Sequence, residues 1–169
     1  MHNRLSSQHQ PGAWQYNQDN QLLGYGVGSE QITLSYSTNG HTTREVTGNP
    51  AAPLKVRDYR YNAAERLTEI DDNGQAIGRY RYDPMGRRVY KETATETTWF
   101  IYADEGLIAE LQADGTLKRG YGWKPQGLWG TDPLWLADKT GAGASDWSTH
   151  VYQNDHLWTP QRLTDSLRW

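Results

Sequence analysis

The sequence predicts an all-β fold in which consecutive antiparallel β-hairpins form a curved sheet. Three observations predict it: short runs in which apolar and polar residues alternate, turn-forming pairs between those runs, and few windows with the periodicity of an amphipathic helix. In residues 31–36, for example, Ile32, Leu34 and Tyr36 fall on one face of an extended strand, as expected for a half-buried pleated surface.

Other predicted strands carry the same signal with aromatic side chains. Residues 58–61 and 79–82 each place two tyrosines on one face and an arginine on the other, and residues 98–102 are rich in strand-forming side chains. Between the strands lie pairs that tolerate the positive φ of tight hairpins: Asn39-Gly40, Asn73-Gly74, Met85-Gly86, Glu105-Gly106 and Asp114-Gly115.

The hairpins recur at a spacing of about 20 residues, which fits two short strands and their loops. Five tyrosines mark the repeat at separations of 20, 25, 21 and 20 residues: Tyr16, Tyr36, Tyr61, Tyr82 and Tyr102. Four residues after each of them stand Asn20, Gly40, Glu65, Gly86 and Gly106, and four of these five are turn formers.

Composition and charge narrow the classes of function. The chain has 169 residues and a formal net charge of −3, which argues against the broad cationic surface of a nucleic-acid binder. It has no cysteine, so disulfides and cysteine chemistry are excluded. Only 36% of the residues are hydrophobic, but 8 Trp and 11 Tyr are present, so we expect the sheet to be stabilised by cross-strand aromatic packing.

Three segments are predicted along the chain. Residues 1–15 form an N-terminal tail, residues 16–120 a sheet of hairpins, and residues 121–169 a Trp-rich end in which the regular repeat breaks. No run is long enough to cross a membrane as a helix, and the first residues lack the apolar core of a secretory signal.

Two stretches share the form Y-x-Y-[DN]-x-x-G-R, the first with Glu65 in place of the glycine. They are Tyr59-Arg60-Tyr61-Asn62-Ala63-Ala64-Glu65-Arg66 and Tyr80-Arg81-Tyr82-Asp83-Pro84-Met85-Gly86-Arg87. Both resemble YD repeats, the building unit of Rhs proteins, which also occurs in insecticidal toxin-complex proteins and teneurins. Residues 121–125, 131–134 and 152–165 resemble the C-terminal part of the conserved Rhs core. That family usually has glycine where Trp158 stands, so we expect a distorted turn there.

The resemblance implies a fragment of an Rhs β-cocoon shell, a non-enzymatic segment that encapsulates a toxic C-terminal domain for contact-dependent bacterial competition. The family's self-cleavage motif, D-P-x-G-L, and its toxin domain have no counterpart in the 169 residues. We therefore expect an orphan or truncated fragment that inherits no catalytic residue of the family.

Partners and location follow from the same resemblance. The expected partners are the remainder of an Rhs shell or a toxin cargo domain, together with components of a secretion apparatus such as type VI; neither nucleic acid nor a membrane span is expected. The expected location is cytoplasmic before delivery, and then secreted or at the cell surface as part of a larger Rhs effector.

No catalytic, cofactor-binding or metal site is predicted. The five histidines lack the helical spacing of a zinc site: His2, His9, His41, His150 and His156. His150 and His156 could form a metal or base site with Asp155, but the resemblance favours a structural turn at residues 154–156.

The other charged and glycine-rich motifs also favour structural roles. The pairs Asp71-Asp72 and Asp104-Glu105 are adjacent at predicted turns, where a solvated position is expected, whereas acid–base catalysis needs carboxyl groups that converge across a cleft. Residues 24–28 are rich in glycine but precede a strand-like segment, not the helix that a phosphate loop requires.

A carbohydrate-binding surface module is the alternative function. Trp123, Trp129 and Trp135 recur every six residues in a Gly- and Pro-rich segment, so their rings could stack on sugars or pack within the sheet. Four arginines are expected opposite the tyrosine rows, on the polar face of the sheet: Arg60, Arg66, Arg81 and Arg87.

Overall fold

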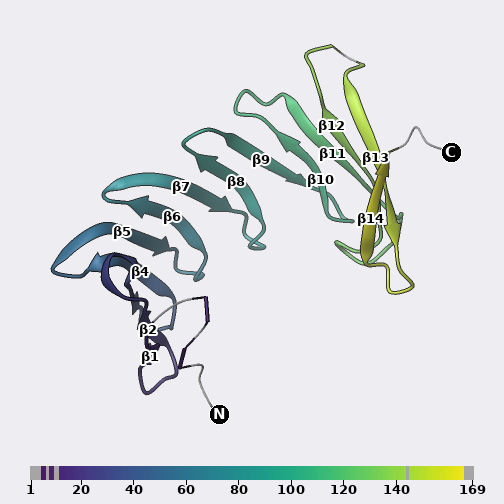
Figure 1. Ribbon diagram of the computed structural model, residues 1–169. Helices are drawn as coiled ribbons and strands as arrows, with labels where there is room; N and C mark the ends of the chain where they lie inside the picture. Colours follow the sequence, from purple (N-terminus) through teal and green to yellow (C-terminus); the bar gives the residue numbers. More distant parts are fainter. Residues whose placement is uncertain (1–4, 7, 10–11, 144, 166–169) are drawn as a thin grey trace. The chain divides into compact units, whose positions relative to one another are not determined.

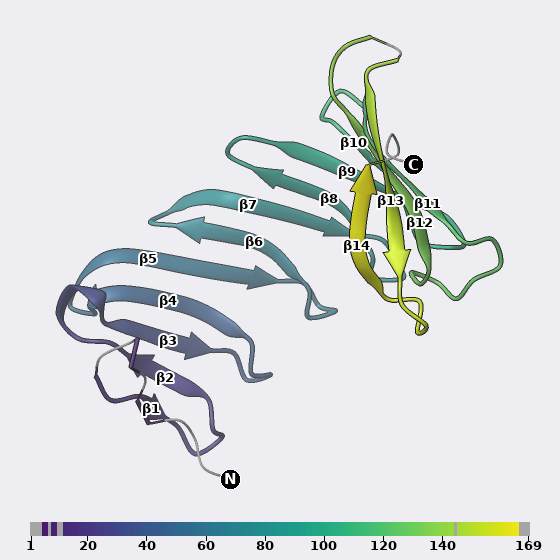
Figure 2. The same cartoon turned by 45° about the vertical axis from the view of Figure 1, so that its right-hand side comes forward.

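The computed structural model describes residues 5–6, 8–9, 12–143 and 145–165 (Figures 1 and 2). Contacts divide the chain into two units, Met1–Tyr80 and Arg81–Trp169. Within each unit the strands pair antiparallel and in the order of the sequence. The predicted all-β fold of consecutive antiparallel hairpins is therefore confirmed.

The first unit holds seven strands among its described residues, although the last two residues of the seventh belong to the second unit. They are β1 (Gln15–Tyr16), β2 (Leu22–Tyr25), β3 (Ile32–Tyr36), β4 (Thr42–Asn49), β5 (Ala52–Tyr61), β6 (Leu67–Asp72) and β7 (Gln75–Tyr82). A 3-10 helix, η1 (Gly28–Glu30), separates β2 from β3 and is the only helical turn in the part of the chain that the structure describes. No helix of that part is long and apolar enough to span a membrane.

The second unit holds the other seven strands of the described residues. They are β8 (Arg88–Thr93), β9 (Thr97–Tyr102), β10 (Leu107–Leu111), β11 (Leu117–Trp123), β12 (Pro133–Lys139), β13 (Trp147–Asn154) and β14 (Pro160–Asp165).

Six turns share one hydrogen-bonding pattern. The N–H of a leading residue donates to the carbonyl four residues on, and its own carbonyl accepts from the residue three positions on, which has a positive φ. The leading residues are Asn17, Ser37, Asn62, Asp83, Gln112 and Asp155, and the positive-φ residues are Asn20, Gly40, Glu65, Gly86, Gly115 and Trp158. Most leading side chains also accept an N–H from within their turn, which explains the preference for Asn, Asp and Ser at this position.

Aromatic side chains tie neighbouring hairpins together. The hydroxyls of three tyrosines and the indole N–H of one tryptophan each donate to the carbonyl of a residue that begins an earlier strand. These pairs are Tyr36 to Leu22 at 2.7 Å, Tyr61 to Thr42 at 2.9 Å, Tyr102 to Arg88 at 2.8 Å and Trp123 to Leu107 at 2.7 Å. Each donor is the last residue of its strand, and three of the five landmark tyrosines make this contact.

Neither unit has a deeply buried apolar core. Among the described residues only Leu136, which is 7% exposed, and Pro133 are buried apolar side chains larger than alanine, and no large side chain there is fully buried. A domain normally buries a sheet face against a second layer. Each unit instead leaves both faces of its strands partly open, and these faces carry the candidate functional residues.

Candidate interaction surface

One face of the second unit carries a group of exposed apolar side chains. Strand register places exposed apolar side chains from β9, β11, β12 and β13 on this side: Trp99, Ile101, Leu117, Trp135 and Val151. Each of them is between 36% and 41% exposed. Because isolated exposed apolar residues are normal but contiguous groups of them mark interaction sites, this apolar face is a candidate docking surface.

Small residues beneath the rings shape the apolar face. Trp135 on β12 lies opposite Gly122 on β11, and its indole covers that glycine so closely that a Cβ placed there would lie 1.9 Å from Nε1. Gly120, on the same strand, would place a Cβ 3.5 Å from the same ring. The ring therefore lies flat over the strand, leaving its outer side towards solvent.

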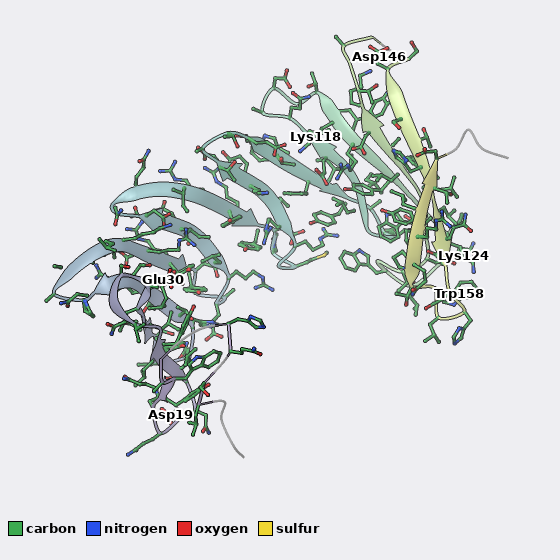
Figure 3. The ribbon with its side chains drawn as sticks, viewed as in Figure 1. Asp19, Glu30, Lys118, Lys124, Asp146 and Trp158 are labelled. Atoms are coloured by element: carbon green, nitrogen blue, oxygen red, sulfur yellow. The ribbon has the colours of Figure 1, made fainter. Side chains whose placement is uncertain are left out.

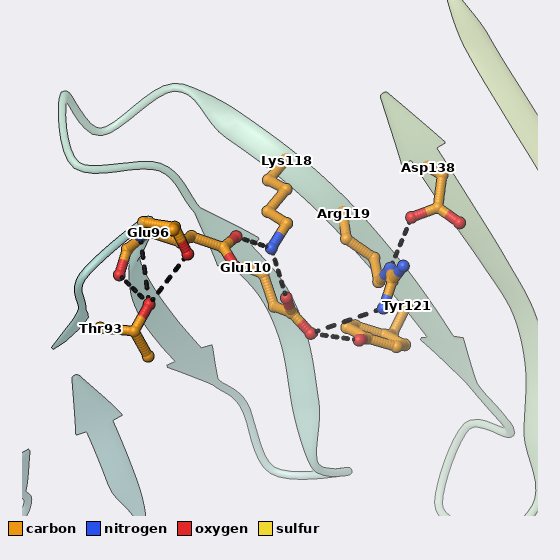
Figure 4. A network of polar contacts seen from close by, with 8 residues as sticks. Thr93, Glu96, Glu110, Lys118, Arg119, Tyr121 and Asp138 are labelled. Atoms are coloured by element: carbon orange, nitrogen blue, oxygen red, sulfur yellow. Dashed lines mark hydrogen bonds and ion pairs between the residues drawn. The ribbon is translucent and has the colours of Figure 1, made fainter. Parts of the chain in front are cut away.

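The opposite face of the second unit carries charges of alternating sign. Glu110, Arg119, Asp138, Ser148, His150 and Asp165 follow one another across β10 to β14 and define this polar face. Figure 4 shows its inner part: Arg119 Nε lies 2.5 Å from Asp138 Oδ1, and Arg119 Nη1 lies 4.0 Å from Glu110 Oε1.

Hydrogen bonds hold this network in one arrangement. The hydroxyl of Tyr121 donates to Glu110 Oε1 at 2.5 Å, while Lys118 pairs with Glu96 and lies 3.8 Å from Glu110 Oε2 (Figure 4). Burial, and then the bond to Glu110, raises the pKa of Tyr121, and the bond to Asp138 raises the pKa of Arg119. Tyr121 therefore stays neutral and Arg119 charged near neutral pH, which suits cross-strand pairing better than proton transfer.

The first unit has its own ion pairs. Asp72 on β6 accepts two bonds from Arg57 on β5, at 2.6 and 3.0 Å, and lies 2.8 Å from Lys55 Nζ. The Arg57 guanidinium holds the pKa of Asp72 at about 2. The neighbouring Asp71 is 7% exposed and accepts the N–H of Gly74 at 2.6 Å. The expected solvated position is thus wrong for both carboxylates, although neither converges on a cleft.

The tryptophans singled out by their spacing have different environments. Trp123 is half-buried and donates to Leu107, whereas Trp129 is 54% exposed and stacks on Tyr102 with ring centroids 6.4 Å apart. Trp135 is 41% exposed on the apolar face. One ring is therefore packed and two are exposed, so the three rings do not form one common binding platform.

The distorted turn expected at Trp158 is not found. Trp158 adopts a φ of 63° and donates its N–H to the Asp155 carbonyl at 3.0 Å, as in the other turns of this type, so the turn is not distorted. Lys124, labelled with Trp158 in Figure 3, places its ammonium 4.0 Å from the centre of the indole and 3.2 Å from Asp132 Oδ2. The ring thus gains a cation–π contact that glycine could not make.

The histidines are dispersed. His2 lies outside the described residues, and His9 is exposed before β1. His41 stacks on Tyr61 with ring centroids 4.8 Å apart, and His156 is exposed in the turn after β13. Asp155 accepts the N–H groups of Leu157 and Thr159, as the structural turn predicted there requires. Among the described residues, no group of three or more His, Asp or Glu is placed to hold a metal.

The remaining motifs have local roles. Asp104 is exposed in the turn after β9, and the Glu105 carbonyl accepts the N–H of Gly130 at 2.7 Å. The glycine run at 24–28 begins at the end of β2 and ends in η1, and β3 follows, in line with the strand-like segment predicted after it.

The arginines fit the predicted polar face only in part. Arg60 pairs with Glu69 on the side of β5 away from the tyrosines. Arg81 instead lies 5.0 Å from the ring centre of Tyr90, and Arg87 lies 4.9 Å from that of Tyr102. Two of the four thus cover aromatic rings.

One arrangement was missed at the level of sequence. His150 lies between Ser148 and Asp165, with hydrogen bonds of 3.0 and 2.9 Å to them. The alternation Ser-x-His within one strand was the available signal, but the aspartate joins it only through the register of β13 with β14.

Comparison with known proteins accounts for the fold. Over 151 residues, or 85% of the chain, it is 30% identical to a protein of Dickeya dadantii (strain 3937) named probable deoxyribonuclease RhsB. The chain is homologous to Rhs proteins. A second relative of the same organism, named probable deoxyribonuclease RhsA, is 28% identical over 149 residues. The chain spans only 10% of the length of either relative.

Solved structures show the same fold. The crystal structure of TcdB2-TccC3 without its hypervariable C-terminal region matches 91% of this chain with a TM-score of 0.59, at 19% identity and over 9% of its own chain. The TcdB2-TccC3-TEV structure matches with the same values. No family model matches the sequence.

Proposed function

We propose that this Rhs-homologous chain is a shell segment that encloses a toxic C-terminal domain of an Rhs-type polymorphic toxin. Homology to Rhs proteins and the likeness to TcdB2-TccC3 support a place in such a shell. The observation that carries the proposal further is the apolar face, because a sheet with so little buried apolar surface gains most when a cargo covers its exposed rings. Enclosure of this kind needs no chemistry from the segment itself.

The unpaired outer edge of β14 supports the same proposal. In the part of the chain that the structure describes, β14 pairs with β13 alone. An exposed strand edge presents free backbone groups that template a further strand. The remainder of an Rhs shell is the partner that we propose for this edge.

Co-expression with a downstream toxin domain tests the enclosure. We expect the two to co-purify, and we expect Ile101→Glu or Trp135→Glu on the apolar face to abolish the association. Leu163→Glu is the matched control, since Leu163 is 40% exposed but stands on the polar face. Failure to co-purify under any condition would overturn the proposal, and sensitivity to Leu163→Glu alone would move the cargo to the other face.

The proposal also covers how the toxin reaches another cell. The segment would reside in the cytoplasm before export by an apparatus such as type VI, and then act in competition between bacteria as part of a larger effector. A competition assay in which the producer carries Ile101→Glu should show a loss of killing. The Leu163→Glu producer should keep its advantage.

A carbohydrate-binding function is favoured by one observation. An open groove in the second unit combines the Trp147 ring with the polar side chains of Gln112, Thr116, Lys139 and Thr140. Aromatic rings flanked by polar groups suit sugars. A glycan titration should then quench Trp fluorescence saturably without any cargo, and Trp147→Ala should abolish that response.

A further inference from the structure

Three side chains at the outer edge of the polar face form a continuous hydrogen-bonded row. Ser148 Oγ lies 3.0 Å from His150 Nε2, and His150 Nδ1 lies 2.9 Å from Asp165 Oδ1. Ser148 and His150 are two residues apart on β13, and Asp165 stands opposite His150 on β14. Strand alternation and register therefore bring a hydroxyl, an imidazole and a carboxylate together on one face.

Chemistry fixes the direction of the two bonds. An ionised carboxylate only accepts, so the neutral imidazole donates Nδ1–H to Asp165. Nε2 then carries the lone pair and accepts the hydroxyl proton of Ser148. A base whose orientation is set by a third group is the arrangement that activates a serine nucleophile.

The row is exposed at its Asp165 end and has an apolar neighbour at its centre. Leu136 on β12, which is 7% exposed, stands opposite His150 and gives the imidazole an apolar neighbour. The side chain of His150 is 22% exposed and that of Asp165 is 73% exposed. Because solvent screens the Asp165 carboxylate, we expect it to orient the imidazole more than to stabilise its charged form.

We propose that Ser148 and His150 hydrolyse small activated carboxylic esters, with Asp165 as a positioning residue. Ser148 Oγ would attack the ester carbonyl carbon while its proton passes to His150 Nε2. The C–O bond to the leaving alkoxide or phenoxide then breaks, and His150 returns the proton to it, leaving an acyl ester on Ser148. Water, deprotonated by His150, attacks that ester. The acyl–Oγ bond then breaks, His150 returns the proton to Ser148 Oγ, and the carboxylic acid is released.

The expected activity is modest. Ser148 stands within paired strands, where backbone N–H groups bond to neighbouring strands instead of forming an oxyanion hole. Catalysis then rests on the general base, whose usual contribution is about 10²–10⁴-fold. This activity is independent of enclosure, because it needs neither a cargo nor the apolar face.

The full chain tests the proposal with p-nitrophenyl acetate and with a fluorophosphonate probe followed by mass spectrometry. We expect a single covalent adduct on Ser148, and a loss of ester hydrolysis of about tenfold or more in Ser148→Ala and His150→Ala. Thr149→Ala is the matched control because Thr149 lies on the same strand but on the apolar side. It should keep the full rate.

Asp165 requires a readout that separates positioning from folding. Asp165→Asn should slow labelling of Ser148 without lowering the thermal unfolding midpoint, and Asp165→Glu should restore part of the rate. Hydrolysis at an unchanged rate in Ser148→Ala, or an adduct on another residue, would overturn the proposal. A third outcome would also overturn it: Asp165→Asn loses labelling because it unfolds, whereas Ser148→Ala stays folded. The row would then only hold β14 in place.

Discussion

The hydroxyl of Tyr61 donates a hydrogen bond of 2.9 Å to the backbone carbonyl of Thr42. Tyr61 ends β5 and Thr42 begins β4, and these two strands pair, so the bond fastens the end of one strand to the start of the strand before it. The same relationship recurs for Tyr36, Tyr102 and Trp123. In a chain with little buried apolar surface, these aromatic groups combine partial burial with a satisfied polar tip.

Tyr61→Phe should therefore destabilise the chain by about 1 kcal/mol, because the ring is kept but the Thr42 carbonyl loses its donor. Chemical denaturation measures the change in the free energy of unfolding. Tyr25→Phe is the control, since Tyr25 also stands in the first unit but no hydrogen bond of its hydroxyl is found among the described residues. Equal effects in the two variants would mean that the Tyr61 bond contributes nothing beyond ring packing.

The tyrosine spacing in the sequence predicts more of the fold than composition does. All five positions that follow the landmark tyrosines by four residues have a positive φ, including Glu65, whose residue type gave no such signal. In four of the five the reason is geometric: the strand ends at the tyrosine and leads into a turn with one hydrogen-bonding pattern, whose fourth residue reverses the chain whatever its side chain. The turn after Tyr102 is shorter, with Ala103 and Gly106 bonded to each other, and Gly106 has a φ of 150°.

Side-chain contacts between strands were less predictable. The row of Ser148, His150 and Asp165 depends on the register of β13 with β14, which a turn of one more residue would shift. The position of Arg87 over the Tyr102 ring likewise depends on where two separate hairpins lie. Local sequence patterns predict the spacing of the hairpins and the positions of the turns. These side-chain contacts depend instead on which residues of paired strands lie opposite one another.

Trp158 offers a test of backbone strain in a turn. At its φ of 63°, a residue with a Cβ costs about 1–2 kcal/mol relative to glycine. Trp158→Gly and Trp158→Ala both lose the contact with Lys124, so the difference between them isolates the backbone. We expect Trp158→Gly to be the more stable variant by about 1 kcal/mol in urea denaturation. Identical midpoints would show that the turn adopts another conformation in the variants.

The ion pair of Asp72 makes the free energy of unfolding depend on pH. The pKa of Asp72, about 2 in the folded chain, lies below the ordinary 3.8, because Arg57 binds the ionised form. The stabilisation is complete above the ordinary pKa and is lost as the pH falls through the folded value. We expect the urea midpoint to drop between about pH 5 and pH 2, and Asp72→Asn to flatten that drop.

The control for this acid dependence is Asp104→Asn. Asp104 is exposed in a turn, and no ion pair or hydrogen bond of its carboxylate is found in the described part of the chain. Its variant should follow the original profile. A profile altered equally by both substitutions would assign the acid sensitivity to overall charge and not to the pairing with Arg57.

Gly122 tests how the Trp135 ring lies on the apolar face. An added methyl would stand 1.9 Å from Trp135 Nε1, so Gly122→Ala must displace the indole. Overpacking of this kind costs about 1–3 kcal/mol when the neighbour is held in place. Gly120→Ala is a close control, because its methyl would lie 3.5 Å from the same ring, an ordinary contact distance. We expect Gly122→Ala alone to lower the thermal midpoint and shift Trp fluorescence to longer wavelength, as the ring moves into solvent. A shift in fluorescence without loss of stability would show that the ring contributes little to the fold and is free to contact a partner.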